Sequence, residues 1–105
     1  MKVVIQNGAN NWLSRKDAES VIRRLPSSWS SSISQVLLAA GPSLSTSFHP
    51  KERVVCLYCP SAPRVAQDKR VAVSALLRAL AGAACAELPD GLEHECQEAV
   101  DGPAA

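Results

Sequence analysis

The chain has 105 residues, of which 47% are hydrophobic, and its formal net charge at pH 7 is +1. This length suits a single domain with a core of its own, and a net charge so near zero excludes strong electrostatic attraction to nucleic acid or to an anionic membrane. The N-terminal apolar run ends at Gln6, too early for a signal peptide, and the most apolar window, 71–86, is shorter than the roughly 20 residues of a membrane span. We therefore expect a cytoplasmic protein.

Two elements are predicted near the N-terminus, a short strand over 2–6 and a helix over 14–25. Ser14 is a favoured helix N-cap, and Asp17, three residues later, completes a pattern like that of a capping box. Apolar residues then recur at helical spacing as far as Pro26, which cannot continue the helix. The helix boundaries are therefore the clearest local signal in the chain.

The outer face of the predicted helix 14–25 is basic. Its cationic residues are Arg15, Lys16, Arg23 and Arg24. Such a face can contact nucleic-acid phosphates, but no aromatic side chain lies between the charges to stack on bases. A face that meets solvent is the better interpretation, and nucleic-acid binding is an alternative that makes these residues interaction candidates.

The middle of the chain predicts an ordered connector followed by three strands. The Ser-rich connector 26–34 contains Trp29 and Ile33, whose spacing lets them pack on one side of a helical turn and hold the segment to the core. The predicted strands cover 35–40, 44–48 and 53–60. The last two form a hairpin, because the turn 49–52 joins them.

Cys56 and Cys59 stand three positions apart, the spacing found in zinc knuckles and in thiol redox centres. In a strand, however, residues three apart point to opposite faces, and their Cα atoms are about 10 Å from each other, beyond the reach of a disulfide. Pro60 in addition favours an extended Cys59, as at a strand end. We therefore predict two strand residues in or beside the core.

The longest helix is predicted over 68–87. Its polar or small residues form one narrow stripe, which should face solvent. The stripe consists of Arg70, Ser74, Arg78 and Gly82. Because nearly all other residues of this helix are apolar, we expect the helix to be covered on most sides, with Cys85 on its buried side.

A zinc site is the first alternative to be weighed. The candidate ligands are Cys56, Cys59, Cys96 and His94, with Cys85 and His49 as further donors. His94 and Cys96 are two residues apart, roughly 200° around a helix, so they cannot converge on one ion. The chain also has no nucleophile elbow and no glycine-rich phosphate loop. We therefore predict no cofactor, no metal ion and no catalytic residue.

The order of these features resembles that of the small zincin-like metalloprotease scaffold. The similar features are a strand, a helix, the Leu25-Pro26 break with Trp29 after it, a strand, the hairpin around 48–52, a long apolar helix and Leu88-Pro89. In that family the hairpin precedes a helix that carries His-Glu-x-x-His, often after two leucines.

In this chain, Leu76-Leu77 are followed by residues that replace every functional position of that motif. Arg78 and Gly82 stand where the histidines would be, and Ala79 stands where the glutamate would be. The resemblance thus implies a similar fold without zinc and without peptidase activity.

The predicted fold is a single α+β domain over 1–100, with a flexible tail at 101–105. Its element order is β-α-β-β-β-α, with a mainly antiparallel sheet packed by two helices and a short C-terminal helix that begins near Leu92. The predicted function is non-catalytic protein–protein contact, with a partner or as a homodimer, because the apolar helix exceeds what one sheet covers. The alternatives are a zinc- or thiol-dependent protein using Cys56 and Cys59, and nucleic-acid binding. Arg78 joins the interaction candidates.

Overall fold

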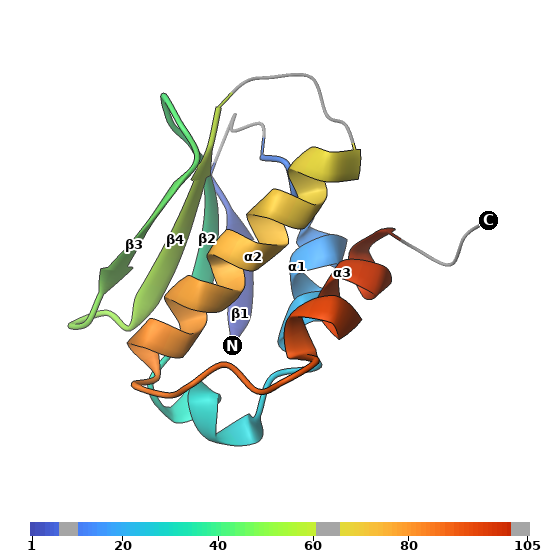
Figure 1. Cartoon of the computed structure of the whole chain (residues 1–105). Coiled ribbons are helices and arrows are strands. Elements are labelled where there is room, and N and C mark those ends of the chain that lie inside the picture. Colours follow the sequence, from blue (N-terminus) through green and yellow to red (C-terminus); the bar gives the residue numbers. More distant parts are fainter. Residues whose placement is uncertain (7–10, 61–65, 102–105) are drawn as a thin grey trace.

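Figure 1 shows the computed structural model of the chain, a four-stranded sheet with helices packed on one side. The structure describes residues 1–6, 11–60 and 66–101. The strands are β1 (Lys2–Ile5), β2 (Gln35–Ala40), β3 (Ser45–His49) and β4 (Val54–Cys59). The helices are α1 (Arg15–Ile22), the short 3-10 helix η1 (Ser27–Ser31), α2 (Ala66–Ala83) and α3 (Leu92–Asp101). The predicted α+β class and element order are confirmed.

The structured part of the chain extends one residue beyond the predicted domain boundary at residue 100. Asp101, which was expected to begin a flexible tail, is the last residue of α3. The remainder of that predicted tail, 102–105, lies outside the described residues.

The sheet is mixed, with the strand order β1-β2-β4-β3. β1, β2 and β4 run parallel, and β3 is antiparallel to β4. The prediction of a mainly antiparallel sheet is therefore wrong. The physical reason is the crossover through α1, which returns the chain to the same end of the sheet, so that β2 runs parallel to β1. The β3–β4 hairpin is antiparallel, as expected, but β3 occupies the edge and leaves β4 to pair with β2.

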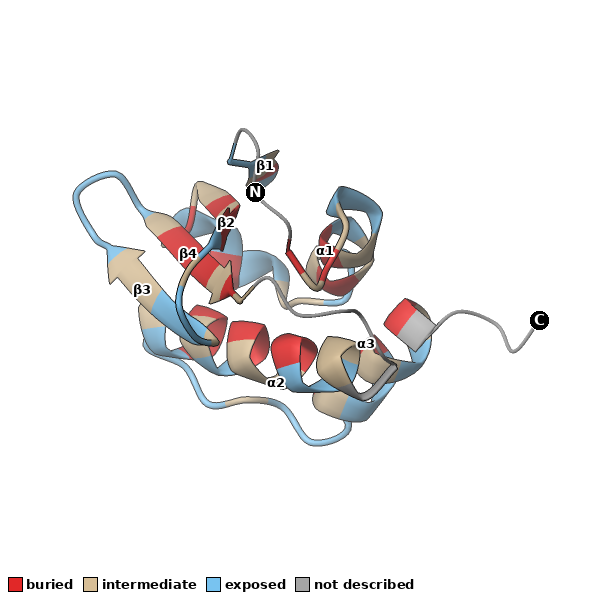
Figure 2. Ribbon diagram, turned by 90° about the horizontal axis from the view of Figure 1, so that it is seen from above, coloured by how far each residue is buried: buried red, intermediate tan, exposed pale blue. Residues whose placement is uncertain are grey.

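α1, α2 and α3 lie on the same face of the described sheet, and the core fills the space between this face and the helices (Figure 1). Figure 2 shows the buried residues on the central strands and on the helix sides turned toward them. α2 packs against β3 and β4, α1 packs against β1, and α3 packs against α1 and α2. No helix in the described part of the chain is long and apolar enough to cross a membrane.

α3 packs beside the predicted polar stripe of α2 and contacts Ser74, which is half-buried and not exposed as predicted. The side chains of Leu76, Leu77 and Leu80 are fully buried, and Gln97 of α3 donates a hydrogen bond to Ser74 Oγ at 3.0 Å. Val71 is the large apolar residue of α2 that stays exposed, at 45%. The apolar surface of α2 is thus covered by β3, β4 and α3 of the same chain, and it does not by itself call for a partner.

α1 begins where the sequence predicts, because a capping box forms at its N-terminus. Ser14 Oγ accepts the backbone N–H of Asp17 at 3.1 Å, and Asp17 Oδ2 accepts the backbone N–H of Ser14 at 3.0 Å, which is a complete capping box. The helix ends at Ile22, before the predicted limit, because the backbone N–H of Leu25 turns back to the Ile22 carbonyl at 3.1 Å. Trp29 is buried, as expected for the connector.

α2 ends four residues before its predicted limit, at Ala83. Beyond it, the backbone N–H of Ala86 donates to the Ala81 carbonyl at 3.0 Å, while Cys85 adopts a φ of 53°. This pattern is a Schellman motif with Cys85 at the left-handed position, a place that glycine usually takes. Cys85 therefore lies outside the helix and is exposed. The prediction that it lies on the buried side of the helix is wrong, because the chain leaves the helix before reaching it.

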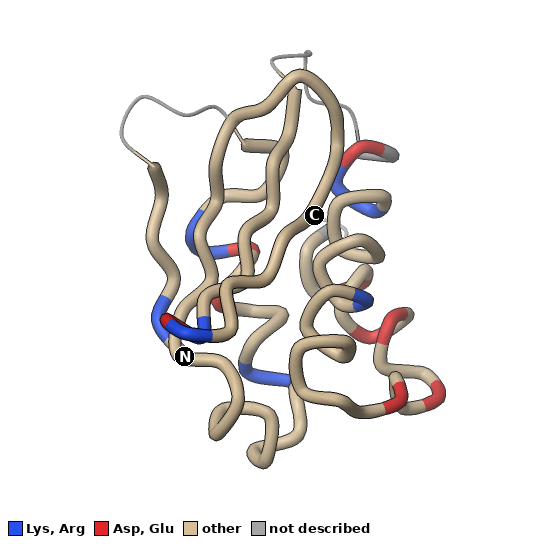
Figure 3. The backbone as a smooth tube through the Cα atoms, turned by 90° about the vertical axis from the view of Figure 1, so that its left-hand side faces the viewer, with Lys and Arg blue, Asp and Glu red and all other residues tan. Residues whose placement is uncertain are grey.

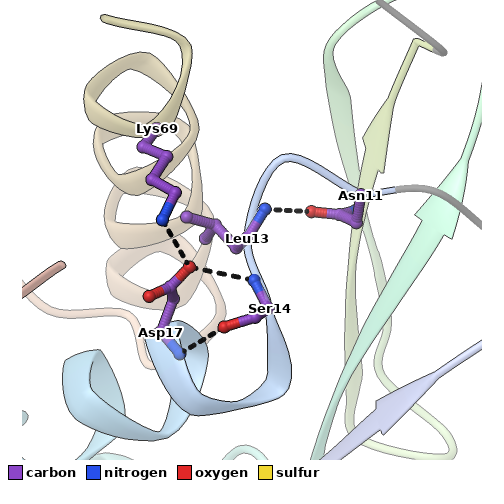
Figure 4. Close-up of polar contacts among 5 residues, drawn as sticks. All are labelled: Asn11, Leu13, Ser14, Asp17 and Lys69. Atoms are coloured by element: carbon purple, nitrogen blue, oxygen red, sulfur yellow. Dashed lines mark hydrogen bonds and ion pairs between the residues drawn. The ribbon is translucent and has the colours of Figure 1, made fainter. Parts of the chain in front are cut away.

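Asn11 is the buried polar residue that joins the start of α1 to the sheet; it is 4% exposed. Its side-chain Nδ2 donates to the backbone carbonyls of Ala39 in β2 and Leu57 in β4, at 3.0 and 3.1 Å. Its Oδ1 accepts the backbone N–H of Leu13 at 3.0 Å (Figure 4). One side chain thus fixes the entry to α1 against two neighbouring strands.

A second contact ties α2 to α1 near the same point. Lys69 Nζ lies 3.4 Å from Asp17 Oδ2, the oxygen that also caps Ser14 (Figure 4). Both side chains are well shielded, which strengthens such a pair relative to one in open solvent. This pair therefore helps to hold α2 beside α1 in the helix layer.

Candidate interaction surface on the open face of the sheet

Side chains of the sheet alternate between two faces, and only one face is covered by the helices of the described chain (Figure 1). The covered face carries fully buried residues, among them Val36, Leu38, Val55 and Leu57. Strand pairing places a second set on the opposite face, which we name the open face. It consists of Lys2, Val4, Gln35, Leu37, Ala39, Ser45, Ser47, His49, Val54, Cys56 and Tyr58.

The open face has an apolar centre and a polar margin. Leu37, Val54 and Tyr58 are half-buried, although none of the described helices covers them. Lys2 is the only Lys, Arg, Asp or Glu in the four strands, all of which lie within the described residues. Figure 3 shows strands that are almost uncoloured, with charged segments at the lower end of the sheet and along the helices. A surface of this composition resembles the core and rim of a protein–protein interface.

A shallow hollow of about 350 Å³ lies on this face. Its lining residues are Gln35, Leu37, His49, Glu52, Val54, Cys56 and Tyr58. Six of them belong to the open face, and Glu52 reaches it from the turn between β3 and β4. The hollow is open to solvent along the sheet, so it offers a docking surface and not an enclosed small-molecule site.

Ser47, His49 and Tyr58 form a polar group beside the hollow. Ser47 Oγ lies 3.2 Å from Tyr58 Oη and 3.4 Å from His49 Nε2. The second distance exceeds the roughly 2.6–3.2 Å of a nucleophile and its base, and the serine hydroxyl is shared with the tyrosine. The arrangement is therefore suited to hydrogen bonding at the margin of an interface.

The two cysteines of the CxxC sequence point to opposite faces of β4. Cys56 pairs with Leu37 on the open face, whereas Cys59 lies on the helix side, where its Sγ donates to Asn11 Oδ1 at 3.4 Å. Neither cysteine forms a disulfide, and both are buried. Both are thus strand residues in or beside the core, as predicted, and their geometry does not suit a shared metal ion or a disulfide.

The other candidate metal ligands are also separated. Cys96 is buried in α3, whereas His94 is exposed, with its Nε2 3.1 Å from Glu98 Oε1. Burial raises the pKa of the Cys96 thiol, the positive charge of Arg24 opposes this shift, and Glu95 adds to it. Among the described residues, no three His, Cys, Asp or Glu side chains come together as metal ligands.

The basic interaction candidates lie in solvent on the helix layer. Arg15 and Lys16 are exposed at the start of α1, and Arg23 and Arg24 are exposed at its end. Arg24 Nη1 donates to the Ser20 carbonyl of its own helix at 2.7 Å. Arg78 is exposed on α2, as its predicted place in the polar stripe requires. These residues belong to two helices and do not share the open face.

The open face itself is missing from the sequence prediction. The run 35–40 reads as a strand buried on both sides, and His49 reads as a turn residue. The polar residue Gln35 is the only sequence signal that one side of this strand is less covered than the other. Every residue after it, 36–40, is apolar, so the strand shows no alternation of polar and apolar residues. Deciding which side is covered requires knowing where the helices pack.

Thiol labelling tests these burial assignments. Cys85 should react quickly with a thiol reagent in the native protein, because it is exposed, while the three buried cysteines react only after denaturation. Ellman's reagent should therefore show one fast thiol per chain, and Cys85→Ser should abolish the fast phase. Two or more fast thiols in the native wild type would contradict the burial of Cys56, Cys59 or Cys96.

We compared the chain with known proteins. No protein-family model, curated protein or solved structure matches this chain.

Proposed function

We propose that this chain is a small, non-catalytic cytoplasmic protein that acts through protein–protein contact, with the open face as its contact surface. The observation that carries this proposal is a sheet face that no described helix covers, with Leu37, Val54 and Tyr58 at an apolar centre inside a polar margin. Interfaces have this anatomy, and tyrosine is among the residues enriched in them.

The geometry favours this function over the alternatives. A zinc- or thiol-dependent activity would need converging ligands or an accessible thiol pair, whereas Cys56 and Cys59 point to opposite faces of β4. Nucleic-acid binding through α1 would need stacking groups among its basic residues, and none of the residues 15–24 is aromatic. The resemblance to a zincin-like scaffold agrees with a non-catalytic role, because Arg78, Ala79 and Gly82 occupy its motif positions.

Site-specific photo-crosslinking in the cells that make the chain tests the proposal. A photoreactive amino acid at Leu37, on the open face, should give a discrete crosslinked product. The same amino acid at Arg78, exposed on the helix layer, should give little or none. Comparable yields at the two positions would overturn the assignment of the open face as the contact surface.

A further inference from the structure

We propose that the open face binds a second copy of this chain, sheet against sheet, about a two-fold axis parallel to the strands. This inference rests on the proposed function of the open face and names its partner. Two sheets pack face to face at about 10 Å, with their strands within about 30° of each other. Such a dimer would supply a second layer over the sheet face that residues 1–6, 11–60 and 66–101 leave uncovered.

The evidence for a second copy is that the open face is complementary in charge to itself. Lys2 stands on the edge strand β1, at the end of the sheet where β2 begins, because it pairs with Gln35. Glu52 lies at the same end, in the turn beside the other edge strand, and it lines the hollow. Ser34 Oγ donates to the Glu52 carbonyl at 2.9 Å, which fixes this turn beside the start of β2.

This placement selects the direction of the axis. A two-fold axis parallel to the strands exchanges the two sides of the sheet but keeps its ends, so Lys2 of each copy approaches the side on which Glu52 of the other lies. An axis across the strands would instead place both charges over the opposite end of the open face. That end carries Ala39, Ser45 and Tyr58, which are uncharged. Only the parallel axis brings opposite charges together.

Two positively charged residues flank Glu52, but neither opposes its pairing with Lys2 of the other copy. Arg53 Nη1 donates to the Ser31 carbonyl at 3.0 Å, which ties the guanidinium to η1 and away from the hollow. Lys51 is exposed in the turn, but the hollow is lined by Glu52 and not by Lys51. The carboxylate is therefore the charge that the turn presents to the open face.

The size of the open face indicates a weak dimer. Four strands about 4.8 Å apart, with about 3.3 Å per residue, span a face of about 20 Å by 20 Å. This area is smaller than the roughly 800 Å² per partner of a standard stable interface. The dimer should therefore dissociate on dilution, and charge pairs at its margin should change its affinity measurably.

Charge reversal tests both the partner and the axis by sedimentation analysis over a range of concentrations. Wild-type protein should form a dimer, and Lys2→Glu or Glu52→Lys alone should weaken it about tenfold, because each places like charges at both symmetry-related contacts. An equimolar mixture of the two variants should restore the dimer. In that pair, one chain brings two carboxylates and the other two ammonium groups, so both contacts again join opposite charges.

The matched control is Arg78→Glu, which reverses an exposed charge on the helix layer and should leave the dimer unchanged. Both test positions are exposed, so the variants should fold, which a circular dichroism melt verifies. A monomer at every concentration, or variants that do not recover on mixing, would overturn this inference. If the chain is monomeric but a photoreactive group at Leu37 still gives a discrete product of another mass, the proposed function survives and the second copy does not.

Discussion

Replacing Asn11 with aspartate should lower the free energy of unfolding by about 3–5 kcal/mol, although the two side chains have nearly the same shape. The Asn11 amide donates to the carbonyls of Ala39 and Leu57. A carboxylate has no hydrogen to donate at this position, so it would bring a negatively charged oxygen against these two carbonyl oxygens inside the core. Asn11→Ala should cost less, about 2–3 kcal/mol, because it leaves backbone groups unpaired without burying a charge.

Urea melts of Asn11→Asp, Asn11→Ala and the wild type measure this difference. Gln6→Glu is the matched control, since it makes the same amide-to-carboxylate change on an exposed side chain at the end of β1 and should stay within about 0.5 kcal/mol. If Asn11→Asp were no worse than Gln6→Glu, the hydrogen bonds of Asn11 to Ala39 and Leu57 would not be what joins the start of α1 to the sheet.

Where the controlling interactions are local, the sequence predicts the structure well. The start of α1 depends on Ser14 and Asp17, three residues apart, and the capping box forms as expected. The opposite orientations of Cys56 and Cys59 follow from the geometry of any strand, whatever its neighbours. Predictions of this kind need no knowledge of the tertiary structure.

Where the structure depends on distant contacts, the sequence leaves several answers open. Side chains alternate between the two faces of a strand whether its neighbours run parallel or antiparallel, so the alternation does not tell which way the neighbours of β2 run. The helix end before Cys85 depends on a backbone turn that usually uses glycine, and here a cysteine takes the left-handed position. A prediction based only on residue preferences for helix ends therefore extends α2 to residue 87, beyond its observed end at Ala83.

The open face also depends on distant contacts and could not be predicted from the sequence. Leu37 and Leu38 are adjacent leucines in the sequence, yet Leu38 is fully buried under the helices and Leu37 is half-buried on the open face. The sequence correctly indicates that α2 is covered on most sides, but not that α3 supplies the cover. The contact surface that we propose is therefore on the sheet and not on the apolar helix.

Leu77→Ala in α2 should lower the free energy of unfolding by about 2–5 kcal/mol, because it removes buried methyl groups and leaves a cavity. Leu77 is 0% exposed, whereas its neighbour Arg78 is exposed on the same helix. Arg78→Leu should therefore change stability by no more than about 1 kcal/mol. Urea melts of the two variants beside the wild type measure the contrast. A larger loss from Arg78→Leu would mean that α2 is rotated from the orientation described, with Arg78 facing the core and paired to a buried carboxylate.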